Sequence, residues 1–318
     1  MIIPEPAFLC RSKLRIAVYA GLAFLLTASA GTARMRIVTT TTDLASIAEA
    51  VGGEHVEVVS LARGTDDPHH IRPRPAFSRL IAEADLLIEV GLDLEHGWLP
   101  NLVANARNPR IRSGRAGRMD ASRDIDLIGV APGPVDHHHG HGHAHAHGAG
   151  NPHYLLDPAS ALVVAENLLE RLRYLDEENS GSYESNWETF RGKLESKIEE
   201  WEAALAPYRG AHVVTYHASY DYFARRFGFE IIDTVEPSPG IEPTPRHISR
   251  LIPRMREENV RMIWSEPVRP SRLLARLAED AGATLVELAE FPGAVPEIDS
   301  YIDLIEHNVR QIVKAMEE

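Results

Sequence analysis

The stretch SYESNWETFRGKLESKIEEWEAALA, residues 182–206, divides the 318-residue chain into two parts. Its large apolar side chains recur at intervals of three or four residues, which places them along one face of an α-helix. These residues are Trp187, Phe190, Leu194, Ile198, Trp201 and Leu205. A helix of this length extends about 37 Å at 1.5 Å per residue. We therefore expect it to bridge two lobes.

Before this helix, short β-branched runs alternate with helical patterns. MRIVTTTT (35–42), HVEVVSL (55–61) and DLLIEVG (85–91) are typical of strands. DLASIAEAVGG (43–53) is typical of a helix with Asp43 as its N-cap. Strands that alternate with helices favour a parallel sheet covered on both faces.

The same alternation returns after the long helix, beginning with the strand AHVVTYH (211–217). The predicted fold class is therefore α/β, with two lobes, each a parallel sheet with flanking helices, joined by one long bridging α-helix. The predicted divisions are a signal peptide (1–33), an N-terminal lobe (34–178), the bridging helix (179–206) and a C-terminal lobe (207–318).

The N-terminus carries the features of an export signal. Three basic residues precede the apolar run IAVYAGLAFLLTASA (16–30), which ends in a small-x-small cleavage pattern. The run is shorter than the ~20 residues that span a bilayer. We expect cleavage near Ala30 and a periplasmic protein. The single cysteine, Cys10, would be removed, so any transition-metal site must use histidines and carboxylates.

Eight of the sixteen histidines lie in DHHHGHGHAHAHGAGNPHYLLDP, residues 136–158. Seven of them alternate with small residues: His137, His138, His139, His141, His143, His145 and His147. A segment of this composition cannot bury a core, so we expect a mobile loop over 133–150. Metal bound there must order the loop, which predicts weak auxiliary binding of variable stoichiometry.

Three other histidines follow predicted strands or close the loop. His69 comes after the strand 55–61, His153 ends the His-rich segment, and His217 follows VVTY. In open α/β sheets, ligands bind beyond the carboxyl ends of the strands. If the three imidazoles converge, they form a nitrogen-rich site suited to zinc. Their separation along the chain leaves convergence open.

Four motifs resemble successive signatures of one family, the cluster A-I solute-binding proteins of zinc and manganese ABC importers. They are DDPHHIRPRP (66–75), EADLLIEVGLDLEHGWLPNLVANA (83–106), NPHYLLDPASA (151–161) and VVTYHASYDYFARRFGFEIIDTVEPSPGIEPTP (213–245). The likeness runs from about residue 36 to the C-terminus. It implies two α/β lobes bridged by a rigid helix and three metal ligands, His69, His153 and His217.

The fourth ligand departs from the family pattern. Many relatives supply Asp from the loop after the last strand, whereas this chain has ELAEFPGAVPEIDSY (287–301) there. Glu290 or a water molecule could complete the tetrahedron. Manganese-selective relatives tend to place Glu at the third position, so His217 favours zinc.

The resemblance implies capture of Zn²⁺ in the periplasm and delivery to an ABC permease with a cytoplasmic ATPase. We expect a monomer, and a zinc chaperone could dock on the His-rich loop. The alternative for that loop is a solvated insertion with incidental metal affinity. The net charge of −13 argues against nucleic acid as a partner. A manganese or iron carrier is the nearer alternative; a three-His zinc hydrolase is disfavoured because no His-Glu-x-x-His motif is present.

Overall fold

The structure is a computed structural model that describes residue 1 and residues 34–130, 150–238, 240–267, 269 and 271–317. The predicted signal peptide, except Met1, lies outside these residues, and so do the seven alternating histidines. Within the described residues, no helix combines the length and apolar character needed to cross a membrane.

The first sheet contains four parallel strands in the order β2-β1-β3-β4. Its strands are β1 (Met35–Thr39), β2 (Val56–Ser60), β3 (Leu86–Glu89) and β4 (Arg118–Asp120). The helices of this half are α2 (Thr42–Gly52), α3 (Pro75–Glu83), α4 (Leu99–Ala106) and α5 (Pro158–Leu175). The sequence predicts the first three strands but not β4, whose three residues include only one apolar side chain.

The second sheet repeats this topology with the order β6-β5-β7-β8, again parallel throughout. Its strands are β5 (His212–Thr215), β6 (Glu230–Thr234), β7 (Met262–Ser265) and β8 (Thr284–Glu287). The helices of this half are α7 (Asp221–Phe227), α8 (Pro245–Glu257), α9 (Ser271–Ala281) and α10 (Tyr301–Glu317). The two sheets, with the long helix between them in sequence, confirm the predicted fold class.

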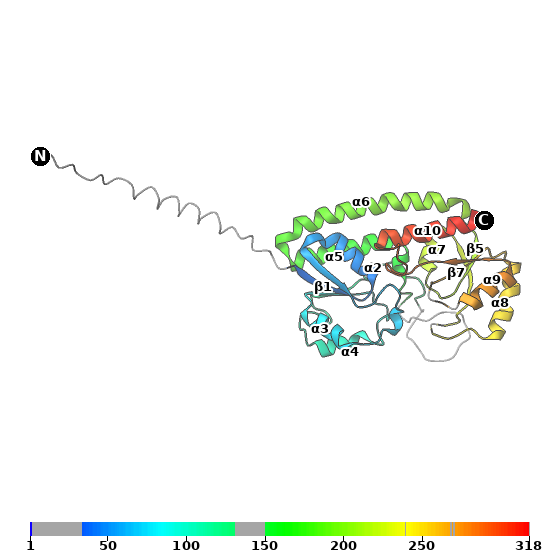
Figure 1. The fold of residues 1–318 in the computed structure, drawn as a ribbon, viewed down its shortest axis with the longest axis horizontal. Helices are drawn as coiled ribbons and strands as arrows, with labels where there is room; N and C mark the ends of the chain where they lie inside the picture. The colour runs from blue at the N-terminus through cyan, green and yellow to red at the C-terminus, as the bar shows by residue number, and fades with distance from the viewer. Residues whose placement is uncertain (2–33, 131–149, 239, 268, 270, 318) are drawn as a thin grey trace. The chain divides into compact units, whose positions relative to one another are not determined.

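The long helix α6 spans Ser180–Leu205. Its buried residues are Tyr183, Phe190, Leu194, Trp201 and Leu205, and they form the apolar stripe together with the partly buried Trp187 and Ile198. In Figure 1, α6 runs past both sheets and α10 lies beside it. The predicted residue boundaries of the two lobes stay a prediction.

One continuous apolar core joins the two halves of residues 34–318. It includes Leu44 and Ile47 of α2, Leu194 of α6, and Leu304 and Ile305 of α10. Two separate clusters pack the outer faces, one under α3 and α4 and the other under α8 and α9. The shared core holds the carboxyl ends of both sheets in a defined relation.

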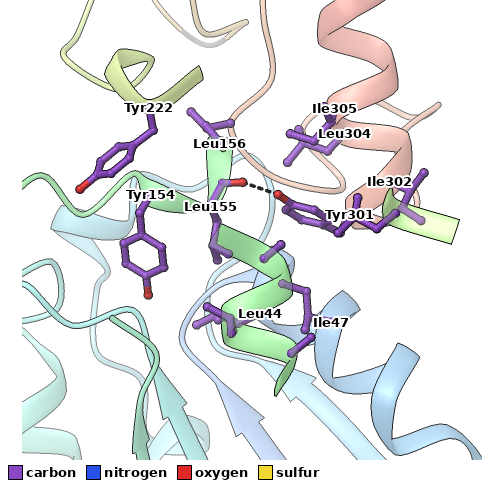
Figure 2. Packing of buried hydrophobic residues seen from close by; sticks show 14 of the residues in the cluster. Leu44, Ile47, Tyr154, Leu155, Leu156, Tyr222, Tyr301, Ile302, Leu304 and Ile305 are labelled. Carbon is purple, nitrogen blue, oxygen red and sulfur yellow. Dashed lines mark hydrogen bonds between the residues drawn. The ribbon is translucent and has the colours of Figure 1, made fainter. Parts of the chain in front are cut away.

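A short 3-10 helix, Tyr154–Leu156, lies at the centre of this shared core (Figure 2). The hydroxyl of Tyr301 donates to the carbonyl of Leu155 at 2.6 Å, and the hydroxyl of Tyr154 donates to the carbonyl of Val90 at 2.8 Å. Both tyrosines are fully buried. Because a buried carbonyl without a partner is costly, these bonds fix the turn that immediately follows His153.

Asp43 is not the N-cap of its helix, so that prediction is wrong. Helix α2 begins at Thr42 with Thr41 as N-cap, and Asp43 lies in the first turn, where its carboxylate accepts from the amide of Leu44 at 2.7 Å. Burial raises the pKa of Asp43 to about 6, against weaker opposing hydrogen bonds from Thr41 and Leu44. Strand β1 ends at Thr39, three residues before the end of the predicted strand 35–42, so the helix begins at Thr42 and Asp43 falls within its first turn.

Leu194→Ala tests the role of the stripe on α6. Leu194 is fully buried in the shared core, so its truncation should lower the free energy of unfolding by about 2–5 kcal/mol. Lys193→Ala, one residue away on the exposed face, is the control and should change stability by less than about 0.5 kcal/mol. Urea unfolding followed by circular dichroism measures both; equal midpoints for the two variants would contradict the packing described.

Candidate metal centre

His69 is presented by a 3-10 turn that follows β2. The turn spans Pro68–His70, and the carboxylate of Asp67 caps it by accepting from the amide of His69 at 3.0 Å. The indole of Trp98 donates to the carbonyl of Pro68 at 2.9 Å. A buried tryptophan and a capping aspartate therefore set the position of the His69 backbone.

His153 immediately precedes the core turn Tyr154–Leu156 and is buried. Its amide donates to the side chain of Asn151 at 2.9 Å. The same Asn151 donates to the carbonyl of Ala218 and to the carboxylate of Asp221, both at 2.8 Å. Since Ala218 directly follows His217, Asn151 links the segment of the second ligand to that of the third.

His217 lies two residues beyond the end of β5 and is buried with its partner Glu236, which lies two residues beyond β6. Nδ1 of His217 is 2.6 Å from a carboxylate oxygen of Glu236, and the other oxygen of Glu236 accepts from the amide of Gly240 at 2.9 Å. This contact places the imidazole proton on Nδ1 and leaves Nε2 for a metal. Nε2 of His217 is buried and has no hydrogen-bond partner among the described residues.

The structure brings the three predicted histidines together. Their ring centroids are 5.6 Å apart for His69 and His153, 5.7 Å for His69 and His217, and 5.3 Å for His153 and His217. One nitrogen from each lies within 4.8 Å of the others, and no other described group of three or more histidines, cysteines and carboxylates meets this condition. The triangle can hold a divalent metal ion.

The electrostatic surroundings favour a cation. Burial by itself would lower the pKa of His217, but the Glu236 hydrogen bond and the charges of Glu290 and Glu266 outweigh it and raise the pKa above its usual value. Burial likewise opposes ionisation of Glu236, yet the bond and charge of His217 hold its pKa below the usual range. The imidazole therefore carries a positive charge more readily than a free histidine, and a metal ion can replace that charge.

Two further carboxylates line the same edge of the second sheet. Glu266 follows β7 and accepts from the hydroxyl of Ser219 at 3.1 Å and from Arg269 at 3.2 Å. Glu290 follows β8, and its carboxylate is 3.7 Å from Nδ1 of His153. Burial, reinforced by the charge of Glu266, raises the pKa of Glu290 to about 8. Glu290 does not belong to the group within 4.8 Å, so its role as fourth ligand stays a prediction.

The role of Glu236 in the centre was not predicted from the sequence. The available signal was its place after the strand next to β5, because residues that follow neighbouring parallel strands lie at one edge of a sheet. Two other described histidines lie outside the triangle: His212 is near Glu230 and Glu258, and His247 contacts the carbonyl of Thr234.

Comparison with known proteins settles the family. A family profile described as "Zinc-uptake complex component A periplasmic" matches residues 37–315. The chain belongs to this family. It is 25% identical over 317 residues to the manganese ABC transporter substrate-binding lipoprotein PsaA of Streptococcus pneumoniae, covering 95% of this chain and 97% of that protein.

Solved structures show the same fold. The crystal structure of ZnuA is 24% identical with a TM-score of 0.73, over 88% of this chain and 98% of that one. The solute-binding protein FpvC of Pseudomonas aeruginosa, in complex with Mn²⁺, is 23% identical with a TM-score of 0.74, over 89% and 98%. The chain is thus an extracytoplasmic metal-binding component of an ABC importer and not an enzyme.

The contact between His217 and Glu236 predicts a specific pH dependence. Metal binding requires His217 to lose its ring proton, so affinity should rise as pH increases through its raised pKa. Glu236→Gln removes the charge that raises this pKa and should move the rise to lower pH. At alkaline pH the variant should bind zinc about 10–100-fold more weakly, because the ring is less firmly oriented.

Zinc dissociation constants measured with a competing chelator from about pH 6 to about pH 8 span the usual histidine range and check this. Glu242→Gln, an exposed change in the same loop, is the control. Identical profiles for Glu236→Gln and the parent protein would show that Glu236 does not act on His217.

Proposed function

We propose that this protein captures Zn²⁺ in the periplasm and delivers it to an ABC permease driven by a cytoplasmic ATPase. The observation that carries the proposal is the third position, where an imidazole, His217, completes a triangle with His69 and His153. Three neutral nitrogen ligands suit zinc better than manganese, which prefers oxygen ligands. Export through a cleaved signal peptide would place the protein where the permease can receive the ion.

The names of relatives do not decide the metal. The family description refers to zinc uptake, whereas PsaA is called a manganese protein and FpvC was solved with Mn²⁺. The proposal that the metal is zinc therefore rests on the donor atoms of this chain. Manganese or iron transport is the alternative, and the titration experiment below compares manganese with zinc.

Glu290 is our proposed fourth ligand. Its side chain is 12% exposed, and one carboxylate oxygen lies 3.7 Å from Nδ1 of His153, which places a candidate oxygen ligand beside the triangle. Burial raises the pKa of Glu290, so in the metal-free protein this carboxyl group keeps its proton more readily than a free carboxyl group does. The charge of a bound ion would drive off that proton. A water molecule in the fourth position is the alternative.

The seven histidines from 137 to 147 supply the proposed auxiliary site. They lie outside the described residues, so the argument for them rests on composition. We propose that they gather zinc at low concentration or dock a zinc-donating chaperone. The binding protein itself is proposed to act as a monomer.

His217→Glu, combined with Glu236→Gln so that two carboxylates do not face each other, tests the metal preference. It exchanges a nitrogen ligand for an oxygen ligand at the third position. Almost any such site binds zinc more tightly than manganese. The informative quantity is therefore the ratio of the two dissociation constants. We expect that ratio to shift toward manganese by about tenfold or more, a change of about 1.4 kcal/mol.

Titration calorimetry with each metal measures the ratio, with His96→Glu on an exposed turn as the control. A parent protein that binds manganese as tightly as zinc would contradict the proposed cargo. A double variant with an unchanged ratio would contradict the role given to His217.

A further inference from the structure

His70 is an exposed neighbour of His69 and is not one of the three histidines of the triangle. It is the last residue of the turn that presents His69, and the two rings are 6.2 Å apart between centroids. The His70 side chain is 65% exposed, whereas those of His153 and His217 are each 5% exposed. Of the three ligands only His69 is partly exposed. His70 is thus an exposed histidine that follows the most exposed of the three ligands in the chain, although Nε2 of His69 is itself buried.

Asp67 holds both histidines of this turn. One oxygen of its carboxylate accepts from the amide of His69 at 3.0 Å, and the other is 3.3 Å from Nδ1 of His70. A carboxylate on Nδ1 directs Nε2 outward for coordination, which is how Glu236 orients His217 inside the centre. The contact of Asp67 with exposed His70 thus resembles the contact of Glu236 with buried His217.

Gly240, from the second half of the molecule, lies close to the ring of His70. A Cβ atom placed on Gly240 would lie 3.7 Å from Cε1 of His70 and 4.0 Å from its Nε2. Gly240 also donates its amide to Glu236, the partner of His217. His70, the last residue of the turn that presents the first ligand, therefore lies near the loop that supports the third.

We propose that His70, oriented by Asp67, is a transient metal site through which divalent ions enter and leave the buried triangle. This inference rests on the proposed function, since it assumes that the triangle binds the transported ion. A hydrated ion must exchange its water molecules for three imidazoles in a largely buried centre. An exposed imidazole beside His69 lets the first exchange take place at the surface, before the ion is fully dehydrated.

A transient site of this kind has a kinetic signature. It lowers the barrier shared by binding and release, and so it accelerates both rates by the same factor. The dissociation constant is the ratio of these rates and is unaffected. A residue that ligates the ion in its final position would instead raise the dissociation rate when removed.

The test is stopped-flow measurement of zinc binding and release in His70→Ala and His70→Gln, with a fluorescent zinc chelator as reporter. We expect both rates to fall about tenfold, which corresponds to about 1.4 kcal/mol in the barrier, with an unchanged dissociation constant. His96→Ala, another exposed histidine of the first half, is the control and should behave as the parent. The His-rich segment is present in all the proteins compared, so any zinc that it binds contributes equally to each measurement.

Two results would overturn the inference: parent-like rates in both His70 variants, or weaker affinity caused by faster release alone. Either would leave zinc capture by the triangle intact. Failure of the parent protein to prefer zinc would refute the proposed function instead, and the two failures are therefore distinguishable.

Discussion

The apolar core shared by the two sheets is the constraint on which the metal centre depends. Two ligands, His69 and His153, come from the first half of the molecule and His217 comes from the second. They meet because the turn Tyr154–Leu156 and α10 pack together (Figure 2), and α6 belongs to the same continuous cluster. A large hinge rotation between the halves would have to expose part of this cluster, at about 25 cal/mol for each Å² of apolar surface. Local movement of the ligand-bearing loops costs less and is the expected route of release.

Around the triangle, the second sheet places one polar group after each strand. In the spatial order of the strands β6, β5, β7 and β8, these are Glu236, His217, Glu266 and Glu290. The first sheet uses a buried carboxylate differently: Glu95 accepts from Thr40 at 2.6 Å and from the amide of Val90 at 2.7 Å, tying the ends of β1 and β3 together. Burial raises the pKa of Glu95 to about 7, and its hydrogen bonds to Thr40 and Val90 give it a structural role. The carboxylates that follow the strands of the second sheet thus contribute negative charge near the ion, and Glu95 makes the edge of the first sheet rigid.

The fold and the position of His217 could be predicted from the sequence, for physical reasons. The stripe on α6 shows the helical period directly, and His217 could be placed at a strand end because β5 is a β-branched run. Contacts that arise only on folding were not readable. Strand β4 has only one apolar residue, so its sequence does not indicate a strand. Helix α2 begins at Thr42, one residue before the predicted N-cap Asp43, because β1 ends earlier than its sequence pattern indicates. Glu236 acquires its partner His217 only when β5 and β6 pair. The convergence of the three imidazoles is of this second kind, and the resemblance to a family supplied it.

The most direct test of the central claim is the location of the bound ion. Anomalous diffraction at the zinc edge from crystals of the zinc-loaded protein would locate it. The account predicts one fully occupied ion with Zn–N distances of about 2.0–2.1 Å to His69, His153 and His217. An ion held by only one or two of these rings, or zinc found only among the seven histidines from 137 to 147, would contradict it.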